Sequence, residues 1–151
     1  MEVKSFVSNR YWKHDVEDNA YALMRDKQGR IAILHSSATQ WQHRFSLDIS
    51  FTNGFIVLRG FLSGSKSYGE EELVVGRRDE SHVGSTREEV IRYMEDNSWM
   101  NEINEFAEAV LNGKKIKYGN SSDALVAMKI VYRIYWQDAE WRKTFGIENP
   151  D

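Results

Sequence analysis

Residues 44–62 read Arg-Phe-Ser-Leu-Asp-Ile-Ser-Phe-Thr-Asn-Gly-Phe-Ile-Val-Leu-Arg-Gly-Phe-Leu. From Phe45 to Phe51 apolar and polar residues alternate, which is the period of a strand with one buried face. Asn53 and Gly54 form the pair that most strongly signals a tight hairpin. The run from Phe55 to Leu62 is apolar at successive positions, as in a strand buried on both faces. These residues predict two antiparallel strands, the second of them central in its sheet or at an interface.

Further strands are predicted on both sides of this hairpin. They cover residues 3–10, 19–25, 30–39 and 72–77, with a turn at residues 26–29 in which Gly29 supplies a positive φ. The period then becomes helical. Ser85 and Glu88 form a capping box that predicts a short helix through Met94.

Two longer helices are expected after it. Asn97 or Ser98 caps the second, whose apolar residues recur at three- and four-residue steps until Gly113. Ser121 or Ser122 caps the third, which runs to about Trp136 and is expected to be mostly buried because its polar stripe is narrow. The fold class is therefore α+β: a single domain, residues 1–151, with a two-layer, largely antiparallel open sheet and helices packed on one face. The other face of such a sheet needs a cover, for which a second subunit or a missing domain is the economical candidate.

Composition excludes several function classes. The formal net charge of −3 gives no electrostatic basis for binding nucleic acid or an anionic membrane. The chain contains no cysteine, so a disulfide framework or a thiolate zinc site is impossible. The N-terminal residues lack the apolar core of a signal peptide, and no apolar run approaches the roughly 20 residues of a membrane span. A cytoplasmic location is the expectation that fits these observations.

Known catalytic patterns are sparse. No Gly-x-Gly-x-x-Gly turn is present to bind a dinucleotide, so this chain is expected to hold no cofactor. Four histidines occur, at positions 14, 35, 43 and 82. His35 and His43 flank an expected turn, but a metal site needs a third ligand and no carboxylate lies between the two histidines. We therefore expect no metal site, and a Ser-His-Asp triad is not expected because there is no nucleophile elbow.

An ordered series of short segments resembles a known family. The segments are Val16-Glu17-Asp18-Asn19-Ala20, Gly29, Ser36-Ser37-x-Thr39-Gln40-Trp41-x-His43, Gly54, Ser67-Tyr68-Gly69-x-Glu71, Glu102-Ile103-x-x-Phe106 with Gly113, and Asp123-Ala124-x-x-x-Met128 with Ile134-Tyr135. In this order they resemble the C-terminal domain of the glucose–fructose oxidoreductase, inositol dehydrogenase and MocA-type (Gfo/Idh/MocA) family. The resemblance covers residues 3 to 135.

The resemblance implies a domain without its catalytic half. In that family an N-terminal Rossmann domain binds NAD(P), and a lysine in a Glu-Lys-Pro-type segment and an Asp/His pair complete the active site. None of these has a counterpart among the 151 residues. What the resemblance implies for this chain is a substrate-side domain whose open sheet forms dimers or tetramers and whose edge helps to enclose a sugar or cyclitol. The Trp-x-His and Ser-Tyr-Gly segments are similar to those of members that act on sugars or nucleotide sugars in surface-polysaccharide biosynthesis.

The expected function is therefore part of an NAD(P)-dependent sugar oxidoreductase (a dehydrogenase), as a fragment or split product that is not catalytically complete alone. Its expected partners are a second copy, a missing Rossmann domain and a sugar-type small molecule. The expected substrate-binding residues are His35, Gln40, Trp41, His43 and Arg44. Trp41 would stack on a sugar face and Arg44 would hold a phosphate or carboxylate; the alternative is that Trp41 and Phe45 belong to the core.

Two other functions stay open. One is a stand-alone, non-enzymatic assembly or binding module derived from the same domain. The other is an unrelated α+β enzyme with a cleft of its own.

Overall fold

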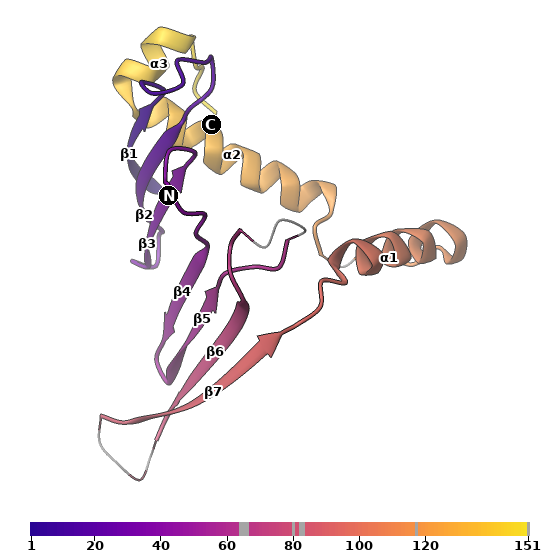
Figure 1. The fold of residues 1–151 in the computed structure, drawn as a ribbon. Helices are drawn as coiled ribbons and strands as arrows, with labels where there is room; N and C mark the ends of the chain where they lie inside the picture. The colour runs from indigo at the N-terminus through magenta and orange to yellow at the C-terminus, as the bar shows by residue number, and fades with distance from the viewer. Residues whose placement is uncertain (64–66, 80, 82–83, 117, 151) are drawn as a thin grey trace. The chain divides into compact units, whose positions relative to one another are not determined.

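A computed structural model of the protein describes residues 1–63, 67–79, 81, 84–116 and 118–150. The chain forms two compact units: residues 1–40 with 114–151, and residues 41–113. Each unit has its own antiparallel sheet, and Figure 1 shows the strands and helices of both. The α+β fold class is confirmed. The expectation of a single sheet is wrong, because the seven described strands belong to two sheets.

The sheet of the first unit contains β1 (Glu2–Ser8), β2 (Asn19–Arg25) and β3 (Ile31–Ser37), in that order. The turn between β2 and β3 is the predicted one. The Asp26 carboxylate accepts hydrogen bonds from the backbone N–H groups of Gln28 and Arg30, both at 2.9 Å. Gly29 has φ 81°, a left-handed value that glycine adopts without steric cost. Local chemistry therefore sets this hairpin.

Helix α2 (Ser121–Gln137) packs on one face of this three-stranded sheet. The buried core is formed by Val3, Ala22 and Ile134, against which Val7, Met24 and Ile130 pack. Ala20 and Ala22 on β2 are buried on the same face of the sheet. Only Ile134 is buried among the described residues of α2, so the expectation of a mostly buried helix is wrong. The helix meets the sheet along one narrow line, and Leu125, Val126, Met128 and Tyr132 remain exposed.

Asn120 caps the N-terminus of α2, one residue before the predicted serines. Its side chain accepts hydrogen bonds from the backbone N–H groups of Ser122 and Asp123, while the Asp123 carboxylate accepts from the backbone N–H of Asn120. This is a complete capping box. A short helix that the sequence did not suggest, α3 (Ala139–Phe145), follows α2 and buries Trp141. Asp138 caps it by accepting from the Trp141 N–H at 2.9 Å, and also accepts from the Val7 N–H of β1 at 2.8 Å.

The second unit contains a four-stranded sheet in chain order: β4 (Ser46–Phe51), β5 (Gly54–Arg59), β6 (Glu71–Arg78) and β7 (Thr86–Tyr93). The Asn53-Gly54 hairpin joins β4 and β5 as predicted. The Phe55 ring lies against Gly76 on β6, where an added Cβ would come within 2.2 Å of it. Helix α1 (Ser98–Asn112) follows β7 and ends at Gly113 with φ 64°, as expected.

Strand β7 replaces the helix that was predicted for residues 85–94, and this prediction is wrong. The strand pairs with β6 along its full length, so its backbone groups are satisfied by the sheet. Arg92 donates to Glu72 at 2.7 Å, and Arg77 donates to Glu89 at 3.5 Å. These pairs join neighbouring strands, and they override a Ser-x-x-Glu pattern that suits a helix N-terminus. None of the described helices is both long enough and apolar enough to cross a lipid bilayer.

Candidate functional site

Three segments of the second unit meet at one end of its sheet. They are the segment before β4, the residues after β5, beginning with Gly60, and the segment before β6. Antiparallel pairing places the start of β4, the end of β5 and the start of β6 at the same end of the sheet. The side chains gathered there are His43, Phe45, Phe61, Ser67 and Tyr68, which we call the histidine–aromatic cluster.

The cluster combines one polar contact with a chain of rings. The Ser67 hydroxyl lies 2.9 Å from Nδ1 of His43, a hydrogen-bond distance at which either atom can donate, depending on the imidazole tautomer. The His43 ring lies 5.0 Å from the Tyr68 ring, and Tyr68 lies 4.5 Å from Phe61. Phe61 in turn meets Phe45 edge-on at 6.0 Å. All these separations are within the usual range for aromatic pairs.

Backbone geometry holds the loop of the cluster against the sheet. Gly60 has φ 61°, and a Cβ at this position would lie 2.1 Å from the Glu70 carbonyl oxygen. Its N–H donates to the Phe45 carbonyl at 3.0 Å. The Glu71 carboxylate accepts from the Leu62 N–H at 2.9 Å. Only glycine permits this approach, so Gly60 determines where Ser67 and Tyr68 lie.

The structure distributes the five predicted site residues over both units. Trp41, His43 and Arg44 belong to the second unit, and only His43 is part of the cluster. Trp41 is fully exposed, so it is not a core residue within its unit. Arg44 is exposed and makes no hydrogen bond or ion pair with any described residue.

The two remaining predicted residues, His35 and Gln40, belong to the first unit. His35 stacks on Tyr21 with ring centroids 4.1 Å apart and planes 12° apart, on the sheet face opposite α2. Gln40 is exposed beyond the end of β3. His35 and His43, the two histidines of the metal hypothesis, thus belong to different units, and among the described residues no group of three ligands is suited to a metal. His82 lies outside the described residues.

Sequence reasoning missed Phe61, Ser67 and Tyr68 as candidate site residues. The signal for two of them was present in the Ser67-Tyr68-Gly69 segment of the family resemblance. Phe61 carried no signal of its own, because an aromatic residue at the end of an apolar strand is typical of a core.

The chemistry available at the cluster suits a polar, ring-shaped ligand. A hydroxyl and an imidazole offer hydrogen bonds to sugar hydroxyl groups, and the exposed ring faces offer contact to C–H groups. Among the described residues, no carboxylate hydrogen-bonds to His43 in the way that a third group orients a catalytic base. The hydroxyl, imidazole and ring faces that are described suit the binding of such a ligand.

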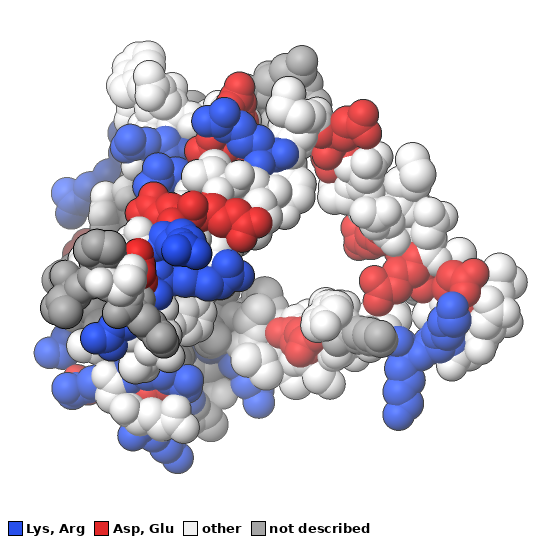
Figure 2. All heavy atoms as spheres, turned by 90° about the horizontal axis from the view of Figure 1, so that it is seen from below, with Lys and Arg blue, Asp and Glu red and all other residues white. Residues whose placement is uncertain are grey.

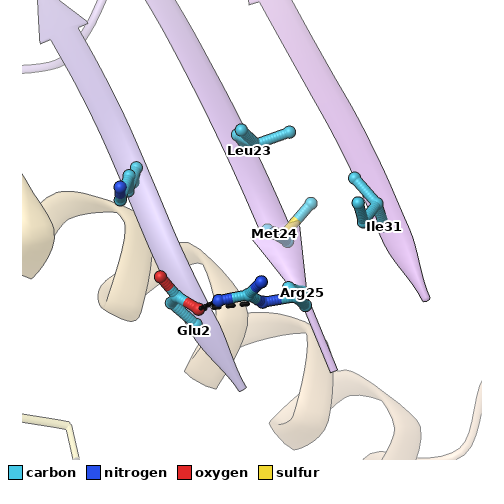
Figure 3. A pocket seen from close by; sticks show the side chains of 6 residues that line it. Glu2, Leu23, Met24, Arg25 and Ile31 are labelled. Atoms are coloured by element: carbon cyan, nitrogen blue, oxygen red, sulfur yellow. Dashed lines mark hydrogen bonds and ion pairs between the residues drawn. The ribbon is translucent and has the colours of Figure 1, made fainter. Parts of the chain in front are cut away.

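A shallow pocket lies elsewhere, on the exposed face of the first unit's sheet. Its volume is about 160 Å³, and Figure 3 shows the Glu2–Arg25 ion pair beside Leu23, Met24 and Ile31. The ion pair holds the pKa of Glu2 below its ordinary value. Sites for small organic ligands usually measure about 300–1,000 Å³, so this pocket is too small for a sugar.

The loop between β1 and β2 is organised by a buried acid. The Asp18 carboxylate accepts hydrogen bonds from the backbone N–H groups of Tyr11 and Trp12, at 2.8 and 3.2 Å, and from the Asn19 side chain. Burial disfavours the carboxylate, but these hydrogen bonds outweigh it and lower the pKa of Asp18. The neighbouring Glu17 accepts a hydrogen bond from the Tyr135 hydroxyl at 2.6 Å, which joins the loop to α2. We assign this acidic segment a structural role.

Charged side chains of both signs are interspersed on the face drawn in Figure 2.

Comparison with known protein families, with curated proteins and with solved structures found no match for this chain.

Proposed function

We propose that this chain is the substrate-side and oligomerisation domain of an NAD(P)-dependent sugar or nucleotide-sugar oxidoreductase. One observation carries the proposal. The Trp41-Gln42-His43 and Ser67-Tyr68-Gly69 segments, which belong to the family resemblance, meet through the hydrogen bond between His43 and Ser67, 24 residues apart in the chain. Two segments that are distant in the sequence thus each contribute residues to one cluster.

Each residue has a proposed role in binding the sugar. His43 and Ser67 would hydrogen-bond to its hydroxyl groups, and Tyr68 would pack against its C–H face. Trp41 offers a second aromatic surface, and the exposed guanidinium of Arg44 suits the diphosphate of a nucleotide sugar. NAD(P) would be held by a separate Rossmann domain, because these residues include no glycine-rich turn that fits a dinucleotide.

Oligomerisation is proposed to use an open sheet face of the second unit. Strand register places Leu47, Ile49 and Phe51 on the same face as Ile91 and Tyr93. All five side chains are exposed within the described structure. A face of this kind is typical of a surface that packs against another protein, and a second copy of the chain would cover it symmetrically.

Ligand titration tests the binding role. A uridine-diphosphate hexose and the free hexose would be titrated by calorimetry into the intact chain and into two variants. His43→Ala should weaken binding by about tenfold, the usual effect of losing one hydrogen bond of about 1.4 kcal/mol. His14→Ala, an exposed histidine outside the cluster, is the matched control and should bind like the natural chain. Equal affinity in both variants, or no binding by any of the three proteins, would contradict the proposal.

A non-enzymatic assembly module is the second candidate. The observation that favours it is the breadth of exposed apolar surface on the second unit's sheet. A chain that forms dimers but binds neither sugar would support this function over the first.

A further inference from the structure

Helix α1 presents an apolar stripe that nothing in its unit covers. Trp99, Ile103, Phe106 and Val110 follow one another at steps of four, three and four residues, which places them on one side of the helix. Each exposes between 60% and 74% of its surface, and no residue of α1 is buried. An isolated helix of 15 residues is marginally stable in water, so α1 requires a packing partner.

The charges of α1 narrow the choice of partner. Its polar side carries Glu102, Glu105 and Glu108, and the helix contains no lysine or arginine. This excludes an anionic membrane surface, which attracts helices with basic polar faces. It also disfavours pairing of α1 with another α1, because glutamates would then face glutamates.

A groove of matching character lies beside α2. It has a volume of about 540 Å³ and lies between the helix and the C-terminal segment. Its helical wall is formed by Leu125, Met128 and Tyr132, each about half exposed, with Lys129 beside them. Phe145, Ile147 and Pro150 line the other wall, which also carries Glu148.

The helical wall of the groove matches part of the stripe in length and is complementary to it in charge. Leu125 and Tyr132 lie seven positions apart, or about 10.5 Å along the helix, as do Trp99 and Phe106, and the stripe continues for about 6 Å to Val110. Lys129 beside the apolar wall provides a cation for an acidic helix. Amphipathic helices commonly bind to apolar grooves through anchors at three- and four-residue spacing, as on α1.

We propose that α1 of one copy binds in the α2 groove of a second copy, and that the two copies exchange these helices reciprocally. At side-chain areas on the order of 150–250 Å², the stripe exposes roughly 500 Å² of apolar surface. Two reciprocal contacts then bury on the order of 1,500–2,000 Å² in total, the size of a stable interface. Reciprocal exchange closes the assembly as a two-fold dimer.

The absence of cysteine from the chain allows a direct test. Ile103→Cys is introduced into a copy carrying a mass tag, and Met128→Cys into an untagged copy. The two proteins are mixed at micromolar concentration under mild oxidation. Each copy has one thiol, so a disulfide between the tagged and untagged chains reports only contact between copies.

The matched control is Glu108→Cys, on the side of α1 opposite the stripe, in place of Ile103→Cys. The mixed disulfide should form on the order of 1,000-fold faster with Ile103→Cys, because a thiol held against the groove has an effective concentration in the millimolar rather than the micromolar range. Equal slow rates with both variants, or a monomer by light scattering of the unmodified chain, would overturn the proposal.

This test is separate from that of the proposed function. Phe51→Asp, on the proposed sheet interface, should leave the rate of the mixed disulfide unchanged. A loss of cross-linking in that variant as well would show that the sheet, rather than the helix exchange, brings the copies together.

Discussion

Ser5 on β1 donates its hydroxyl to the main-chain carbonyl of Ile134 on α2 at 2.6 Å, across 129 residues of sequence. Both residues are buried, and Ile134 belongs to the core that joins the helix to the sheet. The bond therefore attaches the N-terminal strand to a helix near the other end of the chain.

Replacement of Ser5 should measure this attachment. Ser5→Ala should lower the free energy of unfolding by about 1 kcal/mol, because it removes one buried hydrogen bond. The measurement is urea denaturation followed by circular dichroism. Ser50→Ala, on the exposed strand β4, is the control and should change the free energy by less than about 0.5 kcal/mol. Equal stability of the two variants would show that the Ser5 bond contributes nothing.

Replacement of Asp138 should lower the free energy of unfolding more than replacement of Ser5 does. Its carboxylate accepts the backbone N–H groups of both Val7 and Trp141. Asp138→Ala removes a helix cap and leaves two N–H groups without their acceptor, so we expect a loss of about 2–4 kcal/mol in urea denaturation. The neighbouring exposed acid offers a control, since Glu140→Ala should cost less than about 0.5 kcal/mol. An equally small loss of unfolding free energy in Asp138→Ala and Glu140→Ala would contradict the assignment that Asp138 stabilises both β1 and α3.

Gly60 and Gly69 allow the effect of backbone strain to be distinguished from the effect of a steric clash, because both have left-handed backbone conformations. Gly60 and Gly69 have φ of 61° and 79°, but a Cβ meets the Glu70 carbonyl only at Gly60 and finds open space at Gly69. Gly69→Ala should cost about 1–2 kcal/mol from backbone strain alone. Gly60→Ala should cost more and should also displace Tyr68 and Ser67 from His43, which the NMR shifts of the His43 ring protons would report. Unchanged His43 shifts in Gly60→Ala would show that Gly60 does not position the cluster.

The Tyr135–Glu17 hydrogen bond predicts a pH dependence at high pH. Burial and then the hydrogen bond to Glu17 raise the pKa of Tyr135 above its ordinary value near 10. Folding therefore favours the protonated phenol, and its contribution to stability is complete below pH 10 or so and is lost as the pH rises further. Tyr135→Phe should unfold at lower urea concentration than the natural chain at pH 8, and the difference should shrink between pH 10 and 11. Tyr118→Phe, an exposed tyrosine, is the control, and an equal pH slope in all three proteins would contradict the assignment.

Local patterns predicted much of the secondary structure correctly. The turn at Asp26–Gly29, the Asn53-Gly54 hairpin and the end of α1 at Gly113 all depend on the conformations that a few neighbouring residues prefer. The same holds for the strands whose apolar residues alternate. These features are readable from the sequence because their energies arise within a few residues.

Tertiary contacts decided the rest. Residues 86–93 carry glutamates and arginines that suit either a helix or a strand, and pairing with β6 through Glu72 and Arg77 selected the strand. The meeting of His43 with Ser67 depends on the close approach of backbone at Gly60, which no pattern in the sequence expresses. By itself, the sequence determined the turns, six of the seven described strands, the α+β class and the absence of cysteine chemistry. The tertiary structure alone decided the division into two sheets and the residues of the cluster, because register and long-range contact depend on partners that are distant in the chain.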